Sequence, residues 1–195
     1  MLGLGNDLIR SGGINNTLVD YTSNFCSSVD GWLKYSVDQG DMAITYNQNP
    51  NSDGGPDEDC WLKAVWDTNQ TGSSGIKTPI FHSEGIMAGD TIEIDYRIFM
   101  KNDDGQFIGS DTISFQTKYT AEVAGETNPG FGFNHSNQNG DEVLSMSIDS
   151  TFPGAGGFDT GDFYVRIAWN VAADYAQAGA IVYIKDFTVI HQRPI

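Results

Sequence analysis

Strict alternation of apolar and polar residues is the feature that most constrains the fold of this chain. In the stretch "DTIEIDYRIFM", apolar side chains fill every second position from Ile92 to Ile98, and charged side chains fill the positions between them. Successive side chains of a strand point to opposite faces, whereas a helix repeats its apolar positions every three or four residues. The same alternation occurs in "DMAITYN", "DTISFQTKY", "EVLSMSIDS" and "DFYVRIAWNV". The pattern therefore predicts many short strands, each with one face against a core.

Turn-forming residues separate these runs. They occur in "KNDDGQ", in "NQNGDE" and in the glycine-rich stretch "FPGAGGFDTGD". The last run, "AIVYIKDFTVI", is apolar on both faces in part, which is typical of a central strand. The sequence shows no long amphipathic helix and no internal repeat. We therefore predict an all-β fold, specifically a two-sheet antiparallel β-sandwich of the jelly-roll kind.

The chain is long enough for one domain with a sizeable core, and it opens with a segment of different character. Residues 1–19 are rich in glycine and asparagine and show no clear period, so we predict an N-terminal arm followed by a single domain over residues 20–195. Exposed apolar side chains on such an arm are costly unless something covers them. We therefore expect the arm to dock onto other copies or onto a larger assembly, the alternative being a disordered or locally packed terminus. The apolar side chains of the arm include Leu2, Leu4, Leu8, Ile9 and Ile14.

The charge balance excludes two classes of partner. The chain has 10 Lys and Arg against 26 Asp and Glu, which gives a formal net charge of −16. Such a charge repels the phosphates of nucleic acids and the anionic surface of a membrane, so we expect neither as a partner. It favours solubility and cation binding. No apolar run approaches the roughly 20 residues that a membrane-spanning helix needs.

The N-terminal sequence bears on the state of the two cysteines. The opening "MLGLGNDLIRSGG" has neither the basic region nor the long apolar region of a signal peptide, so we expect synthesis in a cytoplasm. In that compartment the default for Cys26 and Cys60 is a pair of reduced, buried thiols. A disulfide between them is the alternative.

Three stretches resemble a known family when they are taken in order. "NFCSSVDGWLKYS", "GIMAGDTIEIDYRIFM" and "GAIVYIKDFTVI" are similar to the opening, a middle strand and the closing strand of galactose-binding-like jelly rolls, especially carbohydrate-binding modules of the family 4/9 type. The resemblance spans roughly residues 20 to 190 and implies glycan binding without catalysis. It also implies a structural Ca²⁺ with Asp186 as a ligand. The Glu of the family's opening motif is Cys26 here, which departs from that calcium site.

The acidic stretch "NPNSDGGPDEDCW" is a second candidate for Ca²⁺. Asn49, Asn51 and Asp53 match the first half of a calcium loop, but Cys60 stands at the twelfth position, where a bidentate Glu is needed. An EF-hand is therefore excluded. A looser calcium site remains open, because hard cations need only clustered oxygens, and so does a solvated acidic turn. The candidate ligands are Asp53, Asp57, Asp59 and Asp186.

The stretch "EIDYR" argues against a glycosidase. Jelly-roll glucanases place two carboxylates and a third acidic residue at alternate positions of one strand, and hydrolysis needs two carboxylates. Glu93 and Asp95 fit, but Arg97 occupies the position of the acid/base and cannot exchange a proton at neutral pH. No nucleophile motif is present, and His82, His135 and His191 lie far apart in sequence. We predict that the protein is not an enzyme.

A polar strand face is the predicted ligand-binding surface. Sugar sites combine aromatic side chains with polar groups. If two of the predicted strands share a sheet, their outward side chains form one such surface. Alternation also places two of the tryptophans on opposite faces of "CWLKAVW", so we expect one to be exposed, while Trp32 and Trp169 belong to the core. The candidate carbohydrate-binding residues are Trp61, Trp66, Glu93, Asp95, Arg97, Tyr164, Arg166 and Asn170.

Together these features favour a non-catalytic binding protein. The short glycine-rich opening resembles those of small structural proteins of tailed phages. We therefore expect a structural or adhesion protein of a phage particle, assembled in the host cytoplasm, that binds glycans and contacts virion proteins or other copies through its arm. The alternative is an extracellular, stand-alone or excised carbohydrate-binding module of a polysaccharide-degrading system.

Overall fold

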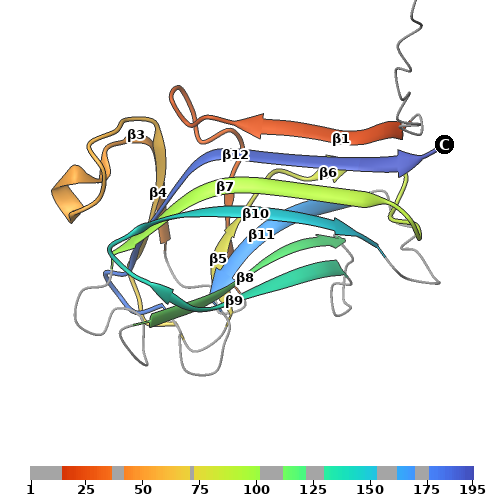
Figure 1. Ribbon diagram of the computed structural model, residues 1–195. Coiled ribbons are helices and arrows are strands. Elements are labelled where there is room, and N and C mark those ends of the chain that lie inside the picture. The colour runs from red at the N-terminus through yellow and green to blue at the C-terminus, as the bar shows by residue number, and fades with distance from the viewer. Residues whose placement is uncertain are drawn as a thin grey trace, which may run out of the picture.

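The computed structural model describes residues 15–36, 42–70, 73–101, 112–121, 130–152, 162–169 and 176–195. These residues form twelve strands and one short 3-10 turn, η1 (Pro50–Asp53). The strands make two antiparallel sheets that pack face to face as two layers (Figure 1). The predicted all-β, two-sheet sandwich is therefore confirmed. No helix within the described ranges is long and apolar enough to cross a membrane.

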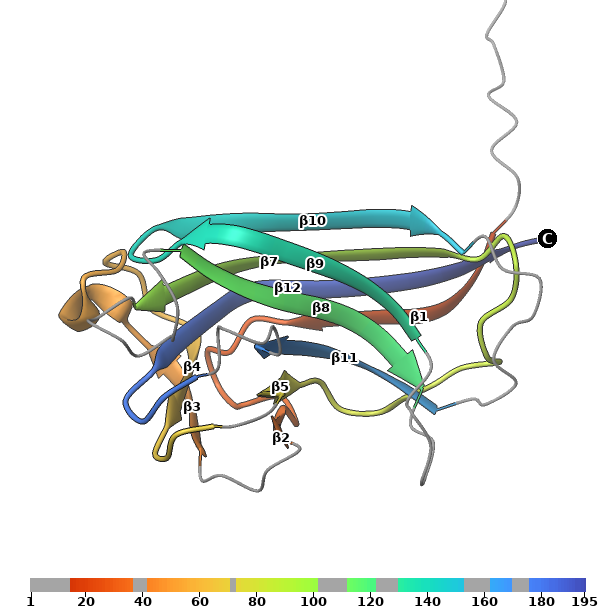
Figure 2. The ribbon, with the colours of Figure 1, turned by 90° about the horizontal axis from the view of Figure 1, so that it is seen from below.

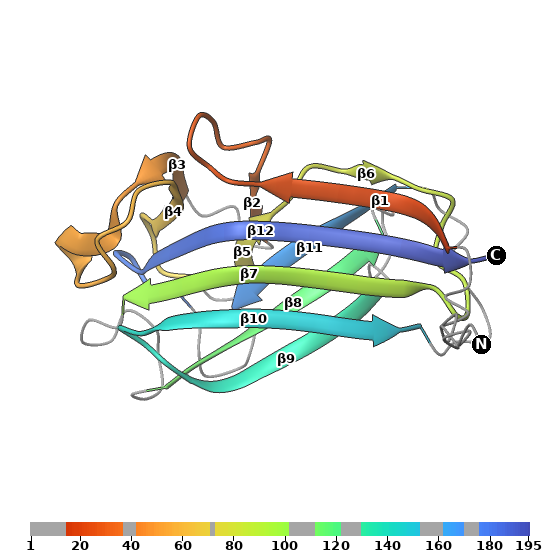
Figure 3. The ribbon, with the colours of Figure 1, turned by 45° about the horizontal axis from the view of Figure 1, so that its top comes forward.

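Sheet A has six strands. Its order is β10-β7-β12-β4-β3, and β1 pairs with the remaining length of β12. Figure 3 shows β1, β12, β7 and β10 side by side. The strand β12 has neighbours along both edges, so its predicted central position is confirmed. The bounds of the strands are β1 (Asn15–Ser23), β3 (Met42–Gln48), β4 (Trp61–Trp66), β7 (Thr91–Lys101), β10 (Val143–Thr151) and β12 (Ile181–Pro194).

Sheet B also has six strands. Its order is β2-β5-β11-β8-β9 (Figure 2). The short strand β6 pairs with β11 beyond β5. Because β9 belongs to sheet B and β10 to sheet A, the chain passes between the sheets at the predicted turn around Asn139 and Gly140. The bounds are β2 (Leu33–Ser36), β5 (Ser74–Lys77), β6 (Phe81–His82), β8 (Thr112–Ala121), β9 (Gly130–Asn139) and β11 (Asp162–Trp169).

The core lies between the sheets and is built from the inward positions of the alternating strands. On β7 the side chains at positions 92, 94, 96, 98 and 100 are buried there. Trp32 and Trp169 are core residues, as predicted. Trp169 packs edge-on against Trp66 with ring centroids 5.3 Å apart. Burying one large apolar side chain stabilises the fold by about 1.5–3 kcal/mol, so this layer accounts for most of the driving force.

The beginning of the domain differs from the prediction. The strand β1 starts at Asn15, so residues 15–19, which were assigned to the arm, are part of sheet A. A register shift between Thr17 and Val19 interrupts the alternation of the two faces. The period-two pattern therefore did not predict this strand. The remainder of the arm, residues 1–14, lies outside the described residues.

A buried polar network links β12 to the other elements at one end of the sandwich. Asp90 and His191 are fully buried, and the Asp90 carboxylate accepts hydrogen bonds from Arg193, from His191 Nε2 at 2.9 Å and from the Met87 amide at 2.8 Å. Burial alone raises the pKa of Asp90, but the hydrogen bonds hold it below its usual value. Burial lowers the pKa of His191, while Asp90 opposes that shift. The Nδ1 atom of His191 lies 3.3 Å from the Tyr119 hydroxyl.

Candidate binding faces

The acidic stretch folds over the outer face of sheet A. Residues 49–60, here called the acidic loop, cover a small second cluster of buried aromatic side chains made of Trp61, Phe99 and Tyr183. A Cβ on Gly55 would lie 2.5 Å from the Pro50 Cβ and 2.9 Å from the Phe99 ring, so only glycine permits this close approach. The acidic loop is therefore a lid over apolar surface.

Carboxylates of the acidic loop pair with basic side chains of sheet A. The Asp53 carboxylate lies 2.8 Å from Lys63 Nζ and 3.7 Å from Lys101 Nζ. The Glu58 carboxylate lies 2.8 Å from Arg97 and 3.0 Å from Lys185. The hydrogen bonds from Arg97 and Lys185 hold the pKa of Glu58 at about 2. These pairs anchor the lid to the sheet.

The same contacts bear on the predicted calcium site. Asp53 is held by Lys63 and Lys101, and Asp186 lies 3.6 Å from Arg97, so both carboxylates already face cations and fit a metal ion poorly. Asp57 and Asp59 instead accept hydrogen bonds from the Asn49 side-chain amide at 2.9 and 3.2 Å. No group of three or more metal-ligating side chains occurs in the described part of the chain.

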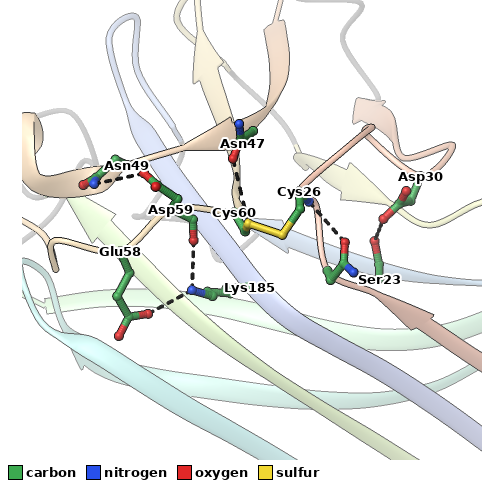
Figure 4. The surroundings of a disulfide bond; sticks show 10 residues. Ser23, Cys26, Asp30, Asn47, Asn49, Glu58, Asp59, Cys60 and Lys185 are labelled. Carbon is green, nitrogen blue, oxygen red and sulfur yellow. Dashed lines mark hydrogen bonds and ion pairs between the residues drawn. A yellow bond between two sulfur atoms is a disulfide. The ribbon is translucent and has the colours of Figure 1, made fainter.

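The two cysteines form a disulfide, so the expectation of reduced thiols is wrong. Cys26 follows β1 and Cys60 precedes β4, and their Cα atoms lie 4.3 Å apart (Figure 4). The pairing of β1 and β4 with the same strand, β12, brings the two ends together, which sequence separation alone does not reveal. The bond ties the acidic loop to the segment that follows β1.

A hollow lies beside this disulfide. It has a volume of about 470 Å³ and is lined by Val29 and by residues 44–48 of the edge strand β3. Tyr46 at its rim is 44% exposed. The backbone N–H of Asn47 donates a hydrogen bond to the Phe25 carbonyl oxygen at 2.8 Å. Its lining includes the polar residues Thr45, Tyr46, Asn47 and Gln48 and no charged side chain.

The predicted binding residues lie on two opposite faces instead of one. Glu93, Asp95 and Arg97 share the outer face of β7, as predicted, but β7 belongs to sheet A. Tyr164 and Arg166 share the outer face of β11, which belongs to sheet B. The idea that they form one surface is therefore wrong. Asn170 lies outside the described residues.

Neither predicted tryptophan platform is exposed. Trp61 and Trp66 do point to opposite faces of β4, but both are buried, with 0% and 1% exposed surface. Trp66 is in the main core, and its indole donates to Ser74 at 3.1 Å. Trp61 lies beneath the acidic loop, with the Arg97 guanidinium 5.1 Å from its ring centroid. The loop covers the face on which an exposed ring was expected.

Three basic residues form a row across the outer face of sheet B. Arg166 on β11 is directly opposite Lys77 on β5 and Lys118 on β8. Directly opposite residues have Cβ atoms about 5 Å apart, so the row spans about 10 Å. Burial and the nearby charge of Arg166 lower the pKa of Lys118.

Aromatic and amide groups flank this basic row. Arg166 donates to the Tyr35 hydroxyl and lies 4.7 Å from its ring centroid, and Lys77 Nζ lies 4.6 Å from the Tyr164 ring centroid. Arg166 also donates to Gln116 at 3.1 Å, and Gln116 donates to Asn134 at 2.9 Å. The outer face of sheet B thus combines Tyr35, two amides and three cations, whereas Tyr164 points to the same face but is buried, with 1% exposed surface.

Sequence reasoning missed most of this face. It identified Tyr164 and Arg166, but not Tyr35, Lys77, Gln116, Lys118 or Asn134. Gln116 and Lys118 occupy polar positions of the alternating run "DTISFQTKY", so the alternation did indicate that both point outward. The order in which strands pair decides which outward residues become neighbours, and alternation does not encode that order.

The outer face of sheet A has the opposite charge. Asp20 on β1 is opposite Ile190, Ile190 is opposite Glu93 on β7, and Glu93 is opposite Asp149 on β10. These outward positions form an acidic row beside Asp95. This row of sheet A is therefore acidic, whereas the row across sheet B is basic.

The three histidines do not come together. His82 contacts Asp162 at 2.7 Å, His135 contacts Thr117 at 3.0 Å, and His191 belongs to the buried network with Asp90. Each one has a separate structural partner, so the described residues contain no histidine cluster.

Comparison with known proteins identifies the fold. No family model matches the sequence, and no curated protein matches it significantly. A cyclase from Fischerella sp. TAU, solved in complex with 4-(1H-indol-3-yl)butan-2-one, aligns with a TM-score of 0.59 at 11% identity over 92% of this chain and 98% of that chain. A xylan-binding domain of carbohydrate-binding module family 22 aligns with a TM-score of 0.55 at 13% identity over 87% of this chain and 92% of that chain.

These likenesses define the fold as a jelly-roll β-sandwich, which is shared by a carbohydrate-binding module and a cyclase. At such low identity they establish the fold alone. Proteins with this fold include binding modules and enzymes, so the function has to be argued from the faces of this molecule.

Proposed function

We propose that this chain is a non-catalytic glycan-binding protein and that the glycan binds the outer face of sheet B. The observation that carries the proposal is the placement of the half-buried Tyr35 and the hydrogen-bonded amides of Gln116 and Asn134 around Arg166. Sugar rings pack on aromatic side chains, while amide and cationic groups orient their hydroxyls. The likeness in fold to a xylan-binding domain supports this assignment.

A panel of immobilised polysaccharides tests the proposal. We expect the full chain to bind at least one glycan, and Tyr35→Ala to weaken that binding because the aromatic surface is lost. Tyr46→Ala is the matched control, since Tyr46 is an exposed tyrosine on β3, an edge strand of the other sheet. Equal loss of binding in both variants, or no binding to any glycan, would overturn the proposal.

The non-catalytic part of the proposal rests on Arg97. Glu93 and Asp95 lie on the outer face of β7, but Arg97 beside them is paired with Glu58 and offers no proton-exchanging group. The Fischerella cyclases show that other proteins of this fold are enzymes, so a direct assay is needed. We expect no release of reducing ends from the glycan that binds. Turnover that Glu93→Gln abolishes would contradict this expectation.

The location of the protein is also a proposal. The phage particle suggested by the opening residues stays a prediction, and the alternative is an extracellular module. The Cys26–Cys60 disulfide supports the alternative, because disulfides persist mainly in oxidising compartments. Neighbouring genes for capsid and tail proteins would favour the first, and genes for glycoside hydrolases would favour the second.

Calcium binding likewise stays a prediction from the sequence. Asp57 and Asp59, which converge on the Asn49 amide, are the remaining candidates. A ligand that binds only the native state raises the melting temperature. An unchanged melting curve after treatment with EDTA and after addition of Ca²⁺ would contradict the prediction of calcium binding.

A further inference from the structure

The hollow beside the disulfide runs along the edge of a strand. It is lined by Val29 and by five successive residues of β3, residues 44–48. Because neighbouring residues of a strand point to opposite faces, a hollow that five in succession line lies against the strand's edge. The strand β3 is the outermost strand of sheet A, and β4 lies on its other side. Backbone groups of β3 therefore belong to the lining, and the volume of about 470 Å³ is that of a small-molecule site.

The hydrogen bonds of β4 show which backbone groups of β3 face this hollow. The Trp66 N–H donates to the Ala180 carbonyl at 3.1 Å, on the side of β4 that faces β12. In an antiparallel ladder both backbone groups of a residue point to one side, and those of the next residue point to the other. Val65 and its partner Ala43 therefore bond to each other. The N–H and C=O of Ile44 then point away from β4, toward the free edge.

This stretch of free edge has the length of one amide group. A register shift between Thr45 and Gln48 interrupts the pairing of β3, and Asn47 has a left-handed backbone with a φ of 50°. The Asn47 N–H is already bonded to the Phe25 carbonyl at 2.8 Å. The regular edge before the bulge is too short to pair with a strand, which usually has three residues or more. The adjacent N–H and C=O of Ile44 instead match the C=O and N–H of a single secondary amide.

The side chains around the hollow fit a neutral ligand. Val29 and Ile44 are half-buried and pack against the core, so they form an apolar floor. Tyr46 is 44% exposed and supplies an aromatic surface. A bulge redirects the side chains within it, and the amide of Asn47 has one contact with the described residues, from Oδ1 to Cys60 Sγ at 3.8 Å (Figure 4). Its Nδ2 group is therefore a donor that the described chain leaves unused.

The wall opposite β3 is held in place by the fold. The Val29 carbonyl accepts a hydrogen bond from the Trp32 N–H at 2.9 Å. The Asp30 carboxylate accepts hydrogen bonds from two serine hydroxyls, and the Cys26–Cys60 disulfide joins this wall to the residue before β4. A site whose walls are already fixed loses less conformational entropy when a ligand binds. The hollow is therefore formed before any ligand arrives.

We propose that this hollow is a second carbohydrate site, which binds a neutral N-acetylated amino sugar. The acetamido group pairs with the N–H and C=O of Ile44, and its methyl group packs on Val29. The sugar ring lies against Tyr46, and the Asn47 side chain donates to a hydroxyl. The site goes beyond the proposed function, because it is separate from the outer face of sheet B and takes a ligand with a particular chemical group.

Two disaccharides that differ in one kind of group test the inference. Diacetylchitobiose carries acetamido groups where cellobiose carries hydroxyls, and both are neutral. In calorimetry with the full chain, we expect diacetylchitobiose to bind about tenfold more tightly, because one further hydrogen bond and one buried methyl group together account for such a factor. Polysaccharides without acetamido groups still test sheet B, with Tyr46→Ala as the control there.

Substitutions at two adjacent positions separate the hollow from sheet B. Tyr46→Ala and Asn47→Gly should each weaken the binding of diacetylchitobiose about tenfold. Glycine adopts the left-handed backbone of position 47 without strain, so the loss in that variant comes from the amide. Tyr46→Phe keeps the ring and should bind as the parent does, and so should Tyr35→Ala. Circular dichroism checks the fold of each variant.

The possible outcomes distinguish this inference from the proposed function. Equal binding of the two disaccharides, or binding of neither, would overturn the inference and leave the polysaccharide test of sheet B standing. Binding of diacetylchitobiose that is lost in Tyr35→Ala and kept in Tyr46→Ala would place the ligand on sheet B, which overturns the inference and supports the proposed function. N-acetylalanine methylamide has amide groups but no sugar ring. If it binds as tightly as diacetylchitobiose, the hollow is a peptide site and the inference is wrong.

Discussion

The two outer faces of the sandwich use similar residues for different purposes. On sheet A, Lys63, Lys101, Arg97 and Lys185 are all paired with carboxylates of the acidic loop, which covers Trp61. On sheet B, Arg166 rests on Tyr35 and Gln116, and its face carries no such lid among the described residues. The first arrangement is closed by the chain itself. In the second, the described hydrogen-bond partners of Arg166 are neutral groups.

This difference separates stability from binding. A salt bridge anchored over a buried ring holds a loop in place, because the ring supplies apolar burial and the charges supply orientation. On sheet B the described hydrogen-bond partners of Arg166 are neutral, so we expect Arg166 to contribute less to folding than Arg97 does. We therefore expect substitutions on sheet A to change unfolding and those on sheet B to change binding.

The largest effect is expected from Trp61→Ala. The indole is fully buried under the acidic loop, so its removal should cost about 3–5 kcal/mol of unfolding free energy through lost burial and the resulting cavity. Urea denaturation measures this loss. Trp61→Phe is the control and should cost less, because it keeps most of the apolar volume. A loss below about 1 kcal/mol for the alanine variant would show that the loop is not a structural lid.

Removal of the disulfide should have the next largest effect. Cys26 and Cys60 are 34 positions apart, and closing a loop of that size stabilises a domain by about 2–4 kcal/mol. We expect the double variant Cys26→Ser, Cys60→Ser to lose this amount in urea denaturation. Glycan binding to sheet B by the folded fraction should stay unchanged, since the bond lies on the sheet A side. If binding and stability fall together, the two faces are not independent.

Acid should weaken the sheet A face first. The pKa of Glu58 is held at about 2, below its usual 4.5, because Arg97 and Lys185 favour the charged form. A lowered folded-state pKa gives stability that is present above about pH 4.5 and is lost as the pH falls toward 2. Glu58 is partly exposed, so this pair is worth about 1 kcal/mol or less. Glu58→Gln should therefore lose about that amount at pH 7 and nothing at pH 2.

Unfolding measured across this pH range compares the parent with Glu58→Gln. The difference between the two proteins should shrink steadily as acid is added. Glu142→Gln is a suitable control, since Glu142 lies in the exposed turn before β10. A gap between parent and Glu58→Gln that widens in acid would contradict the assigned direction of the pKa shift.

The smallest effect on stability is expected from Arg166→Gln. Loss of its hydrogen bonds to Tyr35 and Gln116 is offset by relief of its repulsion with Lys118. The unfolding free energy should change by no more than about 0.5 kcal/mol. The matched Arg97→Gln should lower the unfolding free energy by more, because it breaks the ion pair with Glu58. Glu58 then has Lys185 as its remaining side-chain partner. Equal losses at both arginines would remove the distinction between the faces.

Several elements were predictable because their signal is local. The strands β7, β8, β10, β11 and β12 coincide with the alternating runs, and Trp32 and Trp169 are in the core as predicted. The strands β1, β2, β5, β6 and β9 gave no prediction. They are short, carry a register shift or have weak alternation, and their pairing with longer strands places them. A short window of sequence does not indicate which distant strand a segment will pair with.

The candidate site shows the same limit. The outward direction of Glu93, Asp95 and Arg97 follows from a period of two, and so does that of Tyr164 and Arg166. Whether those strands share a sheet depends on hydrogen bonds between segments about 70 residues apart, and they do not. The exposure of Trp61 depends likewise on a loop that folds back over its own sheet.

The sequence by itself therefore determined the all-β class, the two-sheet sandwich and the side to which each residue of a regular strand points, because these follow from backbone geometry and the burial of apolar side chains. Only the tertiary structure decided that Cys26 bonds to Cys60, that the acidic loop is a lid paired with four cations, and that Lys77, Arg166 and Lys118 form one row. Each of these depends on which strands become neighbours. The pairing of distant strands depends on how the whole core packs, so it cannot be inferred from any single stretch of the chain.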